Sequence, residues 1–226
     1  MIDHKREHFN IVAHKNGVTR VTLIEYPGPE DWMEVYRRAL ICENKEPKHQ
    51  PTSEWIARIL DARHSPIRRA MYSYLMQDIP SNTSTHFARH VHAQPYVGSL
   101  RVDRIAADYM QKLINDFGEI VDSDHAPRMT PVGMILDVNA EEIQEMANKR
   151  LCTTAADVTR QIMTAMCGLA STVTPEIRPC LVPRCVYCGG VCHERKCCGK
   201  AKPYREIADS AINHHKEVTA NHEDHA

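Results

Sequence analysis

The side chains best suited to binding a charged small molecule lie between residues 89 and 101, in the segment RHVHAQPYVGSLR. Arginine guanidinium groups hold phosphate through two parallel hydrogen bonds, and a serine hydroxyl adds one more donor. We expect a helix that ends in the turn containing proline and glycine, so that Arg89, Ser99 and Arg101 converge on one oxyanion. This arrangement predicts a phosphorylated substrate.

Histidines in and before this segment are candidates for proton transfer, because imidazole titrates close to neutral pH. They are His64, His90 and His92. The candidate arginines, serine and histidines also have ordinary structural interpretations. Arginines on a helix are usually solvated or paired at the surface. In the same way, Ser99 fits a turn residue beside Gly98, and His90 fits a hydrogen-bonded core histidine.

A second group of chemically active side chains is the cysteine cluster near the C-terminus. Six of the nine cysteines lie between residues 180 and 198, where Gly189 and Gly190 allow the backbone to fold back. Zinc takes four Cys or His ligands in a tetrahedron, and a C-x-x-C turn supplies two adjacent corners. The spacing predicts a structural zinc site, whose ligands are Cys185, Cys188, Cys192 and either Cys198 or Cys197.

Two other interpretations of these cysteines stay open. They also fit free thiols or a redox pair, or a zinc knuckle that binds nucleic acid. The positive charge of such a knuckle would come from Lys196, Lys200, Lys202 and Arg205. Three terminal histidines, His214, His215 and His222, stand in a polar tail and are expected to be solvated rather than bound to metal.

Composition narrows the function classes. Among 226 residues, 28 Lys plus Arg balance 29 Asp plus Glu, for a net charge of -1. The chain therefore lacks the net positive charge that favours nonspecific binding to nucleic acid or membranes. A function in small-molecule chemistry is favoured instead. The chain has no apolar run near the roughly 20 residues of a membrane span, and its N-terminus MIDHKREHFN lacks the apolar core of a signal peptide. We expect a cytoplasmic protein whose cysteines are thiols or metal ligands rather than disulfides.

Periodicity predicts an alternation of strands and helices. Alternating apolar residues and turn signals predict strands at residues 18–26 and 69–79. Helical spacing of apolar residues predicts helices from residue 30, at 53–62, 81–92 and 103–117, after the capping residue Asn139, and at 154–171. Residues 118–131 are acidic and then rich in proline, which is typical of a loop. The composition shifts to Cys, Gly, Pro and basic residues after residue 175, and a helical pattern returns from residue 207.

The segment 89–101 resembles the signature of the flavin-dependent thymidylate synthases, R-H-R-x-x-S-x-N-x-x-S-x-R. The matching residues are Arg89, His90, Ser99 and Arg101. The departures are Val91, Gln94 and Tyr96, which replace the second Arg, the first Ser and the Asn of the signature. These replaced positions bear largely on flavin contact in the family.

Other segments resemble family features in the same order along the chain. His64-Ser65-Pro66 is similar to the family's H-x-[TS]-P segment, shortened by one residue. Arg128 in PRMTP is similar to the arginine of the A-R-x-x-L-P segment. Asn139-Ala140 and Arg150-Leu151-Cys152 with Ala155 resemble the N-A-R … L-R-x-x-x-x-A-Q region, where Glu141 replaces Arg and Ala156 replaces Gln. The resemblance covers roughly residues 55–199.

The resemblance implies an α/β fold of the thymidylate-synthase-complementing-protein type, with a mixed sheet and flanking helices. It implies a catalytic domain at residues 1–179, a Cys-rich zinc-binding segment at 180–202, and a C-terminal helix and polar tail at 203–226. The implied substrate-binding residues for deoxyuridylate (dUMP) are Arg89, Ser99, Arg101, Arg128, Arg150 and His86. Arg150 is placed near the uracil carbonyl, and Arg128 contacts the phosphate from another subunit.

The resemblance further implies FAD as cofactor, with His64, His90 and Asn139 in its binding site, and a homotetramer with composite sites. The implied catalytic residues are Arg150, Arg89 and His90. In such enzymes methylenetetrahydrofolate supplies the carbon, NADPH reduces the flavin that supplies hydride, and the protein polarises the pyrimidine. A fixed cation at the uracil oxygen stabilises the developing negative charge, commonly by about 3 to 4 kcal/mol per donor.

Two alternatives to this enzyme remain. The first is a relative that transfers a one-carbon unit to a pyrimidine nucleotide without flavin, for example by stopping at the hydroxymethyl product. The second, from another class, is a zinc-stabilised module that binds nucleic acid. The near-zero net charge disfavours the second alternative.

Overall fold

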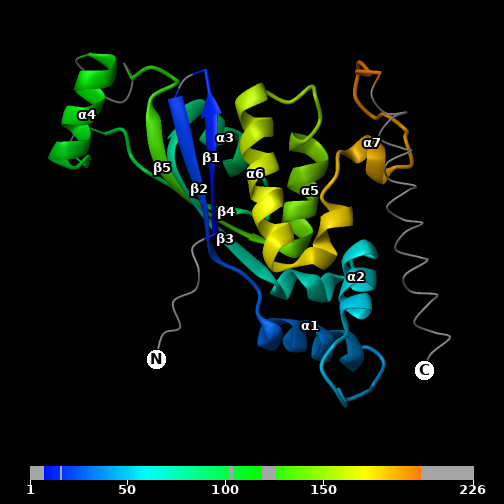
Figure 1. Ribbon diagram of the computed structural model, residues 1–226. Helices are drawn as coiled ribbons and strands as arrows, with labels where there is room; N and C mark the ends of the chain where they lie inside the picture. The colour runs from blue at the N-terminus through cyan, green and yellow to red at the C-terminus, as the bar shows by residue number, and fades with distance from the viewer. Residues whose placement is uncertain (1–7, 16, 102–103, 119–125, 200–226) are drawn as a thin grey trace.

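Five antiparallel strands form one sheet in the order β1-β2-β3-β5-β4, and helices pack along one of its faces (Figure 1). The computed structural model describes residues 8–15, 17–101, 104–118 and 126–199. The strands are β1 (His8–His14), β2 (Gly17–Glu25), β3 (Met71–Pro80), β4 (Gln94–Val97) and β5 (Pro131–Asn139). Every strand pair in this sheet is antiparallel.

The helices lie against the sheet or extend from its ends. They are α1 (Pro29–Ile41), α2 (Ser53–Asp61), α3 (Ser81–Ala88), α4 (Ala107–Phe117), α5 (Ala140–Arg150), α6 (Asp157–Val173) and α7 (Arg184–Tyr187), with short 3-10 turns η1 (Ser65–Arg69) and η2 (Pro175–Cys180). Helix α6 packs on β1 and β2, α5 packs beside α6 and on β5, and α3 contacts β3, β4 and β5 (Figure 1). Among the described residues, no helix has the length and apolar character needed to span a bilayer.

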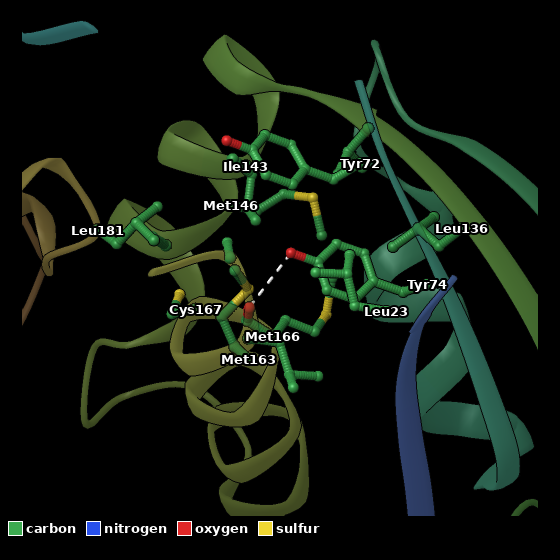
Figure 2. Close-up of a cluster of buried hydrophobic side chains, with 14 of the residues drawn as sticks. Leu23, Tyr72, Tyr74, Leu136, Ile143, Met146, Met163, Met166, Cys167 and Leu181 are labelled. Atoms are coloured by element: carbon green, nitrogen blue, oxygen red, sulfur yellow. Dashed lines mark hydrogen bonds between the residues drawn. The ribbon is translucent and has the colours of Figure 1, made fainter. Parts of the chain in front are cut away.

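The core lies between the sheet and helices α5 and α6 (Figure 2). Tyr72, Tyr74 and Leu136 point from the central strands toward the helices, because alternate residues of a strand face the same side. The Tyr74 hydroxyl donates to the Met166 carbonyl oxygen at 3.2 Å, which satisfies a polar group inside the core. Burial raises the pKa of the Cys167 thiol to about 12, so this cysteine is an inert core residue.

The structure confirms the predicted α/β fold and most of the predicted helices and strands. Strands β2 and β3 and helices α1, α2, α5 and α6 lie within a few residues of the expected ranges. The predicted helix at 81–92 is shorter, because the chain leaves α3 after Ala88 and turns at Arg89 toward β4. Strands β1, β4 and β5 were not predicted. The expected C-terminal helix and tail at 203–226 lie outside the described residues.

Candidate functional site

A buried carboxylate at the start of α5 is the centre of the candidate site. Glu142 is 5% exposed. Its backbone N–H donates to the Oδ1 atom of Asn139 at 2.8 Å, so Asn139 caps the helix. The first turn of a helix favours negative charge, because the backbone N–H groups there are partly positive. A buried carboxylate still needs hydrogen-bond donors for its oxygens, and the segment after α3 supplies them.

His90 links this carboxylate to Arg150. The Nδ1 atom of His90 lies 2.9 Å from Glu142 Oε1, and the other carboxylate oxygen accepts from the backbone N–H of His92 at 3.3 Å. Arg150 donates from Nε to His90 Nε2 at 3.1 Å. Because arginine has only donors, His90 Nε2 must accept, and the ring proton is assigned to Nδ1 facing Glu142. The three side chains therefore form one oriented chain of hydrogen bonds, from carboxylate through neutral imidazole to guanidinium.

Arg150 is the last residue of α5 and is held from two sides. Its Nη2 atom donates to the His86 carbonyl oxygen at 2.8 Å, in addition to the bond from Nε to His90. Partial burial lowers the pKa of Arg150, and the nearby positive charge of Arg89 lowers it further. A guanidinium has five N–H groups, and these two bonds use two of them. The remaining donors of Arg150 suit a carbonyl or phosphate oxygen.

His86 and Arg89 border this chain of hydrogen bonds. The His86 Nδ1 atom lies 2.8 Å from the hydroxyl of the buried Thr159 on α6. Burial lowers the pKa of His86, and the positive charges of Arg150 and Arg89 lower it further. The neutral form of His86 is therefore favoured. Arg89, at the C-cap of α3, is exposed, so the group carries two cations, one partly buried and one at the surface, against one carboxylate.

Ser99, Arg101 and Arg128 belong to a separate group within one chain. Strand β4 runs antiparallel to β5 from the pair Gln94 and Asp137 to the pair Val97 and Met134. It therefore carries the chain away from Glu142 and toward the start of β5, which Arg128 precedes. β4 has four residues and spans about 13 Å. The sequence predicted one phosphate-binding turn for Arg89, Ser99 and Arg101, whereas in the structure β4 lies between Arg89, which precedes it, and Ser99 and Arg101, which follow it.

The described contacts of this second group use the Ser99 hydroxyl and the backbones of the two arginines. The Ser99 hydroxyl oxygen accepts a hydrogen bond from the backbone N–H of Arg101 at 3.1 Å. The Arg128 carbonyl oxygen accepts from the Ser81 hydroxyl at 2.8 Å and from the Asn82 N–H at 2.9 Å, while the residue itself is exposed. Both arginines are thus anchored through their backbones at the surface.

The two remaining cofactor candidates occupy different surroundings. Asn139 uses its side-chain oxygen to cap α5, which is a structural role. His64 lies before η1 and lines an open pocket of about 580 Å³ between α1, α2 and η1. Trp55 and Arg58 line the same pocket. An indole ring, a guanidinium and an imidazole together can contact a planar, anionic ligand.

The predicted zinc ligands lie beside the C-terminal end of α5. A small cavity there is lined in part by Cys152, Cys185, Cys192 and Cys198. Cys188, one of the zinc ligands predicted from the sequence, is partly buried and follows α7. Within the described residues, no three His, Cys, Asp or Glu side chains are arranged to hold one metal ion. The lysines and arginine at positions 200, 202 and 205 and the terminal histidines lie outside the described residues.

Sequence reasoning did not identify Glu142 or Thr159. The sequence does contain a signal for Glu142, because it stands three residues after the capping residue Asn139. That spacing is typical of a capping box, in which the carboxylate bonds to the helix start. Here the carboxylate binds His90 instead. For Thr159 no signal exists in the sequence, since its contact with His86 depends on how α6 packs on α3.

Comparison with known proteins shows the fold. No family model and no curated protein matches the sequence. Among solved structures, the chain is similar to thymidylate synthase X (ThyX) from Helicobacter pylori, a crystal structure with FAD and dUMP. The TM-score is 0.54 with 14% sequence identity, and the match covers 71% of this chain and 98% of that chain. The protein therefore has a ThyX-like fold.

Glu142 is expected to support the structure much more than its neighbour Glu141. Glu142→Ala leaves the buried ring N–H of His90 without its acceptor, and an unsatisfied buried donor costs about 1–3 kcal/mol of the free energy of unfolding. Glu141→Ala removes a more exposed ion pair with Arg68, worth up to about 1 kcal/mol. Urea denaturation of both variants measures the difference. Equal losses would show that the Glu142 contact is no stronger than a surface ion pair.

His86 predicts a loss of stability in mild acid. Its pKa in the folded protein is lowered from the ordinary value of 6.5 by burial and by Arg150 and Arg89. As pH falls below 6.5, the unfolded chain takes up a proton before the folded chain does, so the free energy of unfolding falls. Well above that pH neither state takes up the proton, so His86 does not lower the free energy of unfolding.

The measurement is urea denaturation across this pH window for wild type and His86→Gln. The variant should lose less stability between about pH 7 and 5 than wild type does, because it lacks the titrating group. His49→Gln, at an exposed histidine, is the control and should follow wild type. Identical pH profiles for His86→Gln and wild type would exclude this contribution of His86.

Proposed function

We propose that the protein is an enzyme that transfers a one-carbon unit from methylenetetrahydrofolate to C5 of a pyrimidine deoxynucleotide, with dUMP as the first candidate substrate. The observation that carries the proposal is the oriented chain Glu142, His90 and Arg150 within a ThyX-like fold. The structural relative was crystallised with dUMP. Arg89 and Arg150 are two of the residues that the family resemblance assigns to nucleotide binding, and they lie in this group.

Arg150 is the proposed catalytic residue. Its unused N–H groups would contact a uracil carbonyl oxygen and stabilise the polarised form of the ring, in which negative charge on that oxygen makes C5 nucleophilic. His90 and Glu142 are positioning residues in this proposal, because they fix the direction of the Arg150 side chain. Arg89 would bind an anionic group of the nucleotide from the surface.

A second subunit would complete this site. Ser99, Arg101 and Arg128 are candidate phosphate ligands, and within one chain Ser99 and Arg101 follow β4 whereas Arg89 precedes it. We propose that a second copy brings its own group toward Arg150, within a homotetramer. The sheet face opposite α5 and α6 suits such assembly, because its row of side chains includes the exposed Phe9, Ile11 and Tyr96. An apolar row of this kind is typical of an interface.

The residues present do not fit the flavin contacts of the family signature. Val91 is 87% exposed and has no polar group where the signature has an arginine. Glu141 replaces another arginine and is paired with Arg68, so a carboxylate stands where a cation would meet an anionic cofactor. Asn139 already caps α5. No step of the proposed function therefore depends on FAD or on NADPH, although the structural relative contains FAD.

This mismatch favours a second candidate reaction at the same site, one-carbon transfer that ends at the hydroxymethyl product. C5 of the pyrimidine forms a bond to the methylene carbon of the folate, C5 then loses its proton, and the folate nitrogen leaves as an amine. Water adds to the exocyclic methylene group that remains. The products are tetrahydrofolate and a hydroxymethyl nucleotide, so no hydride donor is consumed. A methyl product instead requires reduction, which reduced flavin supplies in the family.

Arg150→Ala should weaken nucleotide binding and abolish turnover. Loss of a hydrogen bond to a charged group costs about 1.5–3 kcal/mol, which corresponds to a dissociation constant for dUMP raised by about 10- to 150-fold. Lys149→Ala is the matched control, because Lys149 is the adjacent exposed cation of α5. Calorimetric titration with dUMP, after circular dichroism confirms folding, compares the two variants. Equal affinities for dUMP in the two variants would refute the proposed contact.

The absorption spectrum of the purified protein separates the two candidate reactions. We expect no bound flavin and no change in dUMP affinity when FAD is added, because the flavin-contacting side chains are replaced. Product analysis by mass spectrometry should then find the hydroxymethyl nucleotide when methylenetetrahydrofolate and dUMP are supplied. A yellow protein whose flavin is bleached by NADPH, with dTMP as product, would instead establish the flavin-dependent reaction.

A further inference from the structure

The Cys-rich segment has too small a hydrophobic core to hold itself in place. Its buried apolar residues are Cys185 and Val186, with Val182 and Cys192 packed against them, and they form a cluster separate from the main core. Segments of this size are usually stabilised by a metal or a cross-link, because so little apolar surface is buried. The Cys-rich segment therefore requires a further stabilising interaction.

Tight turns fold the chain back on itself in this segment. Gly189, Gly190 and Gly199 have φ angles of 65°, 90° and 78°, which other residues rarely adopt. The Gly190 N–H donates to the Cys185 carbonyl oxygen at 2.6 Å, which closes the turn around C-x-x-C. The Gly199 N–H donates to the Cys197 sulfur at 3.4 Å.

Contacts with α5 hold the segment beside Cys152. Helix α7 packs against α5. The Arg63 guanidinium lies 4.0 Å from the centre of the Tyr187 ring, and Arg63 also pairs with Glu145 on α5. This stacking connects α7 to the main domain by a cation and an aromatic ring. It places the cysteines of the segment next to the residue that follows the C-cap of α5, Cys152.

Four thiols then surround one small cavity. Cys152, Cys185, Cys192 and Cys198 contribute to its lining, and its volume is about 20 Å³, which suits a single ion or water molecule. Cys188 does not line this cavity. Soft divalent metals prefer thiolate ligands.

We propose that Cys152, together with Cys185, Cys192 and Cys198, binds one zinc ion that joins the Cys-rich segment to the end of α5. This set replaces Cys188 of the sequence prediction with a ligand from the main domain. Because no three of the described side chains are yet arranged around one point, metal binding would draw the thiols together across the cavity. The inference does not depend on the proposed enzymatic function.

Metal content and affinity of the full-length chain test the proposal. Wild type should contain one zinc per chain by mass spectrometry, and titration with Co²⁺ should give thiolate-to-metal absorption. Cys152→Ser should weaken zinc binding by more than about 100-fold, the upper range for loss of a residue that only orients a metal ligand. Cys188→Ser and the exposed Cys42→Ser are matched controls and should keep wild-type affinity. Wild type without zinc, or loss in Cys188→Ser with full affinity in Cys152→Ser, would overturn the proposal.

Alkylation of the wild-type protein gives a second measurement that needs no variant. Iodoacetamide should modify Cys152, Cys185, Cys192 and Cys198 slowly with zinc present and faster after chelation, because a bound thiolate is shielded. The rates at Cys42 and Cys188 should not change on chelation. Unchanged reactivity of Cys152 would contradict its role as a ligand even if the segment binds zinc. A change confined to Cys185, Cys188, Cys192 and Cys198 would assign the metal to the segment alone.

Discussion

The contact between the buried carboxylate of Glu142 and the ring of His90 is the constraint on which the site depends. A carboxylate that has lost water must be met by donors, and here His90 and the backbone of His92 supply them. Because Arg150 can only donate, Nε2 of His90 accepts from it, and the ring proton is assigned to Nδ1 facing Glu142. The buried Glu142 carboxylate thereby orients the guanidinium group of Arg150 through His90. The helix dipole at the start of α5 and the Asn139 cap place the carboxylate where its charge is best tolerated.

The topology explains why one chain alone does not assemble every candidate ligand. Helix α3 returns from the end of β3 toward Glu142, and β4 then carries the chain back along β5. Arg89 and Arg101 are only a short segment apart in sequence, yet this reversal separates them. In the proposed assembly a second copy of the chain brings the two cation groups together, and the sheet face that α5 and α6 leave open has an apolar row suited to such a contact.

The sequence predicts the fold where local signals are strong and misses it where tertiary contacts decide. Helices α5 and α6 follow from apolar spacing and from the capping residue Asn139. Strand β5 was missed because it reads as one apolar run with Gly133 inside it, behind a proline, and its pairing with β3 is distant in sequence. Arg150, His90 and Arg89 were identified from their resemblance to a family signature. Glu142 was not identified, because its spacing from Asn139 is also typical of a helix cap. Its contact with His90 depends on how the segment after α3 packs against α5.

The central claim is that Arg150, held by His90 and Glu142, contacts a pyrimidine ring. A crystal structure of the protein soaked with dUMP tests it most directly, since one map reports the ligand, the subunit arrangement and any flavin. The account predicts uracil within hydrogen-bond distance of the Arg150 guanidinium, with the His90 contacts unchanged and the phosphate near arginines of the same or a second subunit. A nucleotide bound elsewhere, with Arg150 still facing solvent, would contradict it.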